Sequence, residues 1–433
     1  MGIYMEIFTS TREKQWYLYE TSEGRENTTL DLDGTIHQEW EGFGGCFNEL
    51  SQIALLSVTE LERNEIYDLL FSKNSDGVRF DFCRIPIGAS DYAESWYSLN
   101  EVEGDYDMKH FSIERDRKYL IPYIKAALKR NPEMKFFASP WSPPTWMKHP
   151  KAYNYGTLVW TEKNLRAYAL YFIKFIQAYA QEGIKISQLH IQNEPVSSQK
   201  FPSCIWTGEQ FTEFIVKYLG PMFKEYSIDT KIWLGTLNCP ETDERAPYTR
   251  YNNYANLVLH NEEAYNYIEG VSYQWAGKYA VQLTHECFPE KKLVQSENEC
   301  GDGTNTWEYA KYIFELFRHY IASGVNAYVY WNMVLQPKGR STWGWEQNSM
   351  ITVEGKAKLN YEYYIMKHFS RFITPGAKRL GIKGHFAGTA AAFKNPDGTI
   401  ILVVQNPFDT EKTFVFNGRC ITLQPDSINT VIF

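Results

Sequence analysis

The stretch His190-Ile191-Gln192-Asn193-Glu194-Pro195 decides the fold. The apolar residues before and within it predict a buried strand over Ile186–Glu194. Pro195 has no N–H to donate, so regular strand pairing should end there. A strand that carries Asn-Glu to its C-terminal tip is what a barrel enzyme supplies to its active site. An ordinary solvated Glu at a strand end is the alternative, and the rest of the chain has to distinguish the two.

Seven further strand-like runs lie between residues 42 and 331, separated by stretches with helical periodicity. The eight predicted strands are Gly42–Phe47, Val78–Ile87, Lys135–Trp141, Ile186–Glu194, Lys231–Leu237, Val271–Trp275, Leu293–Glu297 and Ala327–Trp331. Capping boxes at Ser57–Glu60 and Thr207–Gln210 predict helix starts between them. This alternation predicts a (β/α)8 TIM barrel over residues 40–372. A doubly wound open sheet is the alternative, but no Gly-rich phosphate loop follows the first strand.

The flanking segments, residues 1–39 and 373–433, have the texture of β-structure. Asn395–Gly398 and Asn417-Gly418 lie between β-prone runs and predict two hairpins, and Asp33-Gly34 is a similar turn signal near the N-terminus. We expect both segments to pack together as one β-sandwich-like side domain. The chain would leave this domain, build the barrel and return.

Composition excludes several classes of protein. The net charge is −8 and no block of Lys or Arg is present, so nothing favours nucleic acid or an anionic membrane as a partner. No window approaches 18 apolar residues and the N-terminus lacks a signal-peptide core, so we expect no membrane span and a cytoplasmic protein, or a secreted one if a leader was removed. Seven scattered Cys and nine His show no metal-binding spacing, so we expect no disulfide framework, metal or cofactor.

Polar and aromatic residues cluster at the predicted strand tips, which meet at one end of a barrel. These candidate site residues are Arg84, Asp91, Trp141, Asn193, Glu194, Tyr273, Trp275, Glu297, Trp331 and Asn332. Two carboxylates on different strands, with aromatic rings that stack on sugars, meet the requirement of glycoside hydrolysis. One carboxyl group must keep a proton for the leaving oxygen, and the other must be ionised.

The chain resembles the glucosylceramidase-like glycosidases of glycoside hydrolase family 30. The resemblance rests on blocks in the family's order over nearly the whole chain: Gly42–Gly45, Arg84–Pro86, Ala138–Lys148, Gln192–Pro195, Trp206–Gln210, Leu219–Pro221, Ser296-Glu297, Trp331-Asn332 and His368–Ile373. It implies a retaining mechanism in which Glu194 is the general acid/base and Glu297 is the nucleophile. It also implies that Asn193 binds the sugar 2-hydroxyl and that Arg84 orients Glu297.

The same resemblance implies that Arg84, Asp91, Trp141 and Trp331 line the first sugar subsite. Two positions depart from the pattern. Glu299 shares strand parity with Glu297 and is the alternative second carboxylate, with a supporting role otherwise. Gln274 stands where relatives often carry His or an aromatic residue, so Tyr273 or Trp275 is expected to hold the nucleophile.

The substrate implied first is a terminal β-glucoside, with β-1,6-glucan, β-xylosides and β-fucosides as alternatives within the family. One hydroxymethyl group separates glucose from xylose, a difference worth ~1–3 kcal/mol in a pocket. Two rival classes are a carbohydrate-binding barrel without turnover and a phosphate-binding barrel such as an aldolase. The presence of both Glu194 and Glu297 speaks against the first. The lack of a Gly-rich phosphate loop and of a strand-end Lys speaks against the second.

Overall fold

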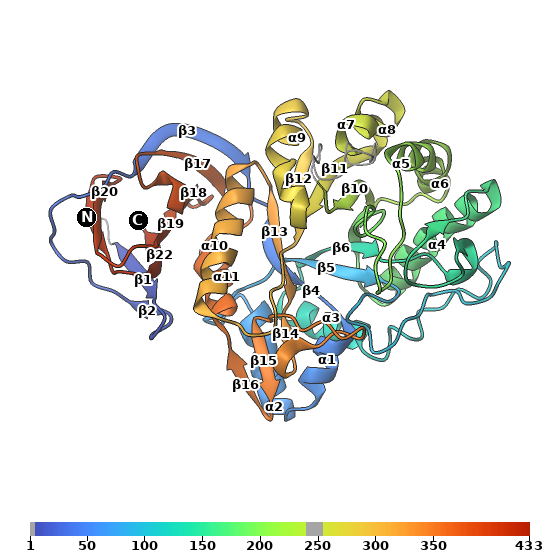
Figure 1. Ribbon diagram of the computed structural model, residues 1–433, viewed down its shortest axis with the longest axis horizontal. Coiled ribbons are helices and arrows are strands. Elements are labelled where there is room, and N and C mark those ends of the chain that lie inside the picture. Colours follow the sequence, from blue (N-terminus) through green and yellow to red (C-terminus); the bar gives the residue numbers. More distant parts are fainter. Residues whose placement is uncertain (1–4, 240–253) are drawn as a thin grey trace.

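The computed structural model describes residues 5–239 and 254–433, and its centre is the predicted barrel (Figure 1). Eight parallel strands close it in chain order: β4 (Gly42–Cys46), β5 (Phe82–Ile87), β6 (Lys135–Pro140), β9 (Ile186–His190), β10 (Lys231–Leu237), β11 (Ile268–Gln274), β12 (Lys292–Glu297) and β13 (Ala327–Asn332). The open doubly wound sheet is therefore excluded. All eight strands lie where the sequence predicts them, with ends that differ by a few residues.

Helices surround the barrel. They are α1 (Glu49–Leu56), α2 (Glu60–Phe71), α3 (Leu120–Arg130), α4 (Glu162–Gln181), α5 (Gly208–Phe214), α6 (Gly220–Glu225), α7 (Tyr254–Leu259), α8 (Glu262–Tyr267), α9 (Val281–Cys287), α10 (Trp307–Ala322) and α11 (Tyr361–Ser370). The capping box predicted at Thr207–Gln210 is present at α5. The one predicted at Ser57–Glu60 is wrong: Ser57 ends α1, and the Thr59 hydroxyl instead accepts from the Glu62 N–H to begin α2.

The interior of the barrel below the strand tips is packed with side chains. Phe82, Phe137, Trp233, Val294 and Val329 come from five strands and are buried against one another. Such a filled interior is typical of this fold, and it leaves space only at the C-terminal end of the strands. The fold therefore indicates that end for an active site.

A seven-stranded antiparallel sheet lies beside the barrel and holds both ends of the chain (Figure 1). Its order is β2 (Tyr17–Leu18), β1 (Glu6–Ser10), β22 (Ser427–Ile432), β19 (Ile400–Asn406), β18 (Ala390–Lys394), β17 (Lys378–Lys383) and β3 (Asp31–Glu39). The hairpin of β20 (Lys412–Phe416) and β21 (Arg419–Leu423) shares a hydrophobic core with this sheet. The predicted side domain built from both terminal segments is confirmed.

Small sheets complete the fold. They are β7 (Lys148–His149) with β8 (Thr157–Leu158), and β14 (Val334–Leu335) with β15 (Ile351–Glu354) and β16 (Lys356–Leu359). In the two described stretches, no helix has the length and apolar content to cross a membrane.

Two of the three predicted turns form hairpins, β18–β19 and β20–β21. Asp33-Gly34 does not, because both residues lie inside the continuous strand β3. Leu380 pairs with Ile36 and Ile382 pairs with Leu32, so β3 advances by four residues over a length in which β17 advances by two. The turn signal is thus used as a bulge, with Gly34 at φ 89° in the region that favours glycine.

Candidate active site

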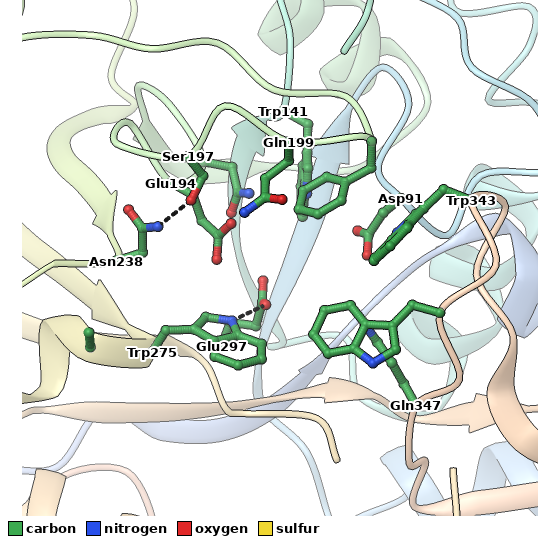
Figure 2. A pocket seen from close by; sticks show the side chains of 14 residues that line it. Asp91, Trp141, Glu194, Ser197, Gln199, Asn238, Trp275, Glu297, Trp343 and Gln347 are labelled. Atoms are coloured by element: carbon green, nitrogen blue, oxygen red, sulfur yellow. Dashed lines mark hydrogen bonds between the residues drawn. The ribbon is translucent and has the colours of Figure 1, made fainter. Parts of the chain in front are cut away.

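Two glutamates border one cavity of about 250 Å³ at the C-terminal end of the barrel (Figure 2). Glu194 follows β9, and Glu297 is the last residue of β12, with β10 and β11 between these strands. Only 8% of Glu194 and 6% of Glu297 is exposed. The barrel therefore brings two largely buried carboxyl groups, 103 residues apart in sequence, to the same space.

The backbone around Glu194 is irregular, contrary to the predicted strand Ile186–Glu194. Regular pairing of β9 ends at His190. The Glu194 N–H nevertheless donates to the carbonyl of Thr236 at 3.0 Å, beyond the part of β10 that pairs with β9. Glu194 has φ 50°, a left-handed conformation that is uncommon for residues other than glycine and is found most often where function requires it.

A bulge in β12 aims Glu297 at the cavity. Tyr273 of β11 pairs with Gln295, but the next residue, Gln274, pairs with Glu297, so Ser296 is extra. Bulges of this kind re-aim side chains and are frequent beside active sites. As a result, both Ser296 and Glu297 reach Gln274: the Ser296 hydroxyl lies 3.0 Å from Gln274 Oε1, and Gln274 Nε2 lies 3.2 Å from Glu297 Oε2.

The guanidinium of Arg84 lies under the cavity with no exposed surface. Its Nη1 donates to Glu297 Oε2 at 2.8 Å, and its Nη2 donates to Asn193 Oδ1 at 2.6 Å and to Ser139 Oγ at 2.9 Å. Its centre lies 4.4 Å from the Trp141 ring. Arg suits such a site because its fork of donors and its flat face are used together. One oxygen of Glu297 is thereby fixed.

Trp275 fixes the other oxygen, because its Nε1–H donates to Glu297 Oε1 at 3.0 Å. The sequence left open whether Tyr273 or Trp275 would hold Glu297 in place of the His or aromatic residue that relatives often carry at position 274. The structure places Trp275 there, together with Gln274 itself.

Asn193 presents its amide N–H2 to the cavity. Its Oδ1 lies within hydrogen-bonding distance of three donors: Arg84 Nη2, the Thr236 hydroxyl at 3.0 Å and Gln274 Nε2 at 3.2 Å. This orientation is fixed, since three donors around one atom require an oxygen. In the described part of the chain no acceptor faces the amide nitrogen, which is therefore available to a ligand hydroxyl.

The two glutamates differ in their electrostatic surroundings. Burial raises the pKa of Glu194 to about 8, and the neighbouring charge of Glu297 adds to the effect. Burial also raises the pKa of Glu297, but Arg84 opposes this, as do the donors Trp275 and Gln274. A proton shared by the pair therefore prefers Glu194. Asp91, a third carboxyl group at the cavity, has a pKa raised well above its ordinary value by burial and then by Glu297.

Predicted site residues divide into two groups by position. Asp91, Trp141, Asn193, Glu194, Trp275 and Glu297 lie on the cavity wall, whereas Arg84, Tyr273, Trp331 and Asn332 do not. The prediction that Tyr273 binds the substrate is wrong. Its side chain points out of the barrel, where its hydroxyl lies 2.5 Å from that of Thr284 on α9. Neighbouring residues of a strand face opposite sides, so Gln274, not Tyr273, faces the site.

Trp331 and Asn332 were also predicted to line the site, but they lie behind the cavity wall. The Trp331 ring stacks on Trp141 at 5.5 Å between centroids. Trp331 Nε1 and Asn332 Nδ2 both donate to Oε1 of Gln347, at 2.9 and 2.8 Å. Gln347 lines the cavity, so these two residues position a wall residue that the sequence did not indicate.

Two family descriptions match the chain. "Glycosyl hydrolase family 30 TIM-barrel domain" matches residues 40–373, and "Glycosyl hydrolase family 30 beta sandwich domain" matches residues 376–431. The chain belongs to glycosyl hydrolase family 30. It is accordingly a glycoside hydrolase, and its substrate is a carbohydrate.

Relatives of this chain carry more than one activity in their names. Putative glucosylceramidase 3 of Caenorhabditis elegans is 30% identical over 94% of this chain and 82% of that protein. Endo-1,6-beta-D-glucanase neg1 of Aspergillus fumigatus is 27% identical over 90% of this chain and 83% of that protein. The crystal structure of SrfJ from Salmonella typhimurium superposes with a TM-score of 0.88 at 25% identity and covers 99% of both chains.

Glu299, the alternative carboxylate, lies off the cavity wall of this family 30 enzyme. It forms an ion pair with Lys278 and accepts a hydrogen bond from the Tyr312 hydroxyl at 2.6 Å. These contacts join the end of β12 to the turn after β11 and to α10. Among the described residues, no group of three or more His, Cys, Asp or Glu side chains is arranged to hold a metal ion.

Several wall residues that the loops contribute were not indicated by the sequence. These are Ser197, Gln199, Phe201, Asn238, Ala276 and Gln347. Loops have no periodicity from which the direction of a side chain follows. Trp343-Gly344-Trp345 carried the available signal, since it lies in a predicted loop after the last strand of the barrel, and both Trp residues line the cavity.

We expect Arg84→Lys to lower kcat by about 10²-fold, because an ammonium group cannot contact Glu297, Asn193 and Ser139 together. Turnover of an aryl glycoside measures this. Arg117→Lys changes the same residue type in surface ion pairs with Glu114 and Glu182 and should leave kcat near the wild-type value. Equal kcat in both variants would contradict the positioning role of Arg84.

Proposed function

We propose that this hydrolase is a retaining β-glycosidase, with Glu194 as the general acid/base and Glu297 as the nucleophile. One observation carries the proposal. Gln274 Nε2 lies 3.1 Å from Glu194 Oε1 and 3.2 Å from Glu297 Oε2. The two oxygens are thus no farther apart than these two lengths end to end. Because one donor reaches both carboxyl groups, their separation is compatible with the ~5–5.5 Å of retaining enzymes.

The roles follow from the surroundings of each carboxyl group. Glu297 receives the charge of Arg84 and the Trp275 N–H, so it is the group that stays ionised and attacks the anomeric carbon. Glu194 holds the proton and gives it to the leaving oxygen. In the second step Glu194 takes a proton from water, which attacks the glycosyl ester of Glu297 and releases the sugar with its configuration retained.

The wall supports binding of one sugar ring. The free amide N–H2 of Asn193 is placed to donate to the 2-hydroxyl, a contact that strengthens in the transition state. Asp91 offers two oxygens to adjacent hydroxyls, and the Trp141 ring offers a flat apolar face. These contacts come from different strand tips and together define the position of the anomeric carbon.

A terminal β-glucoside is the substrate we favour, as the block pattern and the glucosylceramidase names among relatives suggest. A β-1,6-linked glucan is the second candidate, and one observation favours it. A second hollow, lined by Lys200, Trp343, Gly344 and Trp345, shares both Trp residues with the catalytic cavity. An aromatic surface that continues outward suits a further sugar unit.

Removal of either glutamate tests the roles. Glu194→Ala should lower kcat/KM for unactivated aryl β-glucosides by about 10²–10⁴-fold, and Glu297→Ala should lower it more. With a dinitrophenyl β-glucoside, azide should restore turnover in both, giving the β-glucosyl azide with Glu194→Ala and the α-glucosyl azide with Glu297→Ala, as NMR of the product shows. The opposite pairing of products would reverse the roles. Glu299→Ala is the control and should yield no azide product.

The pH profile tests the protonation state. Because Glu194 must hold its proton, kcat/KM should fall as pH rises through about 8, the pKa given by its burial. A dinitrophenyl leaving group needs no proton, so the alkaline fall should weaken with that substrate. A fall centred below pH 6, or one independent of the leaving group, would contradict this assignment.

A substrate panel tests the sugar and the linkage. We expect the highest kcat/KM with aryl β-glucoside among the glucoside, xyloside, fucoside and galactoside. Glucosylceramide in mixed micelles and β-1,6-linked gluco-oligosaccharides, compared at equal concentration, then separate the two candidates. Faster cleavage of longer β-1,6-oligomers would favour the glucanase, and Trp343→Ala should then remove the dependence on length.

A further inference from the structure

Gln274 occupies an unusual position, because one neutral side chain contacts both glutamates. It is the last residue of β11 and is completely buried. Its Nε2 lies within hydrogen-bonding distance of Glu194 Oε1, Glu297 Oε2 and Asn193 Oδ1. Its Oε1 lies 3.2 Å from Arg84 Nη1.

The orientation of this amide follows from its neighbours. A guanidinium can only donate, so the Gln274 atom beside Arg84 must be the oxygen. The Ser296 hydroxyl donates to the same oxygen at 3.0 Å. A flipped amide would set N–H2 against the guanidinium and the carbonyl against two carboxyl groups. The nitrogen therefore points toward the glutamates.

The Gln274 amide has fewer hydrogens than it has acceptors in reach. It carries two N–H groups, and three acceptor oxygens lie within hydrogen-bonding distance. Asn193 Oδ1 already accepts from Arg84 at 2.6 Å and from Thr236 at 3.0 Å. Each carboxyl group can thus receive one hydrogen from Gln274.

Given the proposed retaining mechanism, on which this inference rests, the negative charge alternates between the two glutamates. Glu297 is ionised before attack and becomes an uncharged ester, while Glu194 gives up its proton and becomes ionised. Hydrolysis reverses both changes. We propose that Gln274 is a positioning residue that keeps one N–H on each glutamate, so that whichever one carries the charge already has a donor. A neutral amide does this without a proton of its own to lose.

Gln274→Met tests the proposal, because methionine has nearly the same volume and no donor. We expect two effects of about tenfold each, the size of one charge-assisted hydrogen bond. One is a fall in kcat/KM for an aryl glucoside with a poor leaving group, which reports attack. The other is a fall in kcat for the dinitrophenyl glucoside, which reports hydrolysis of the ester.

The alkaline midpoint of kcat/KM should also move to higher pH in Gln274→Met, since the lost N–H favours the ionised form of Glu194. Packing alone would not move this midpoint. Gln295→Met makes the same change on β12, where Gln295 Oε1 accepts from the Val329 N–H, away from both glutamates. It should leave the midpoint in place. Gln274→Asn keeps an amide and should recover part of the lost rate.

An unchanged midpoint in Gln274→Met, or a fall in only one of the two steps, would overturn the proposal. This outcome is distinct from failure of the proposed function, because the azide products of Glu194→Ala and Glu297→Ala report the roles of the glutamates in a chain that retains Gln274. Loss of folding would appear as a lower melting temperature, and Gln274→Asn then supplies the same two rates and midpoint.

Discussion

A buried positive charge must be matched by partners, and this constraint organises the catalytic end of the barrel. The Arg84 side chain on β5 is shielded from solvent and donates to Ser139 on β6, Asn193 after β9 and Glu297 on β12. Loss of one member of a buried ion pair costs ~3–5 kcal/mol, because the other is left uncompensated. The tips of these strands are therefore coupled, and closure of the barrel is a condition for the site.

The same charge makes two identical side chains chemically different. Glu297 is hydrogen-bonded to Arg84, which favours its ionised form. The pKa of Glu194 is raised by burial and by the negative charge of Glu297. Proton affinity is thus assigned by position relative to one guanidinium. A cation beside Glu194 would reduce this difference, whereas Gln274, which contacts both glutamates, is neutral.

Most strands and many tip residues could be predicted from the sequence, because apolar runs separated by helical patterns have few other solutions. The direction of individual side chains could not. Tyr273 and Gln274 are adjacent, and an error of one residue in the strand register exchanges which of them faces the site. Aiming Glu297 depends on the bulge at Ser296, which leaves no mark in the pattern. Trp331 was predicted to touch the sugar, but it is Gln347, from a later loop, that lines the cavity and accepts from Trp331 Nε1.

The cavity has a floor, made of Asn193 and Glu297 above Arg84, and a rim made of loops, and the two are built in different ways. The floor residues are hydrogen-bonded to Arg84, so changes there disturb the charge network. Phe201, Trp343 and Trp345 belong to loops, which tolerate change because few backbone bonds depend on them. Relatives named for a glycolipid and for a glucan can therefore match the same chain over most of its length. Under the proposed function, the floor binds the first sugar and the rim selects what that sugar is attached to.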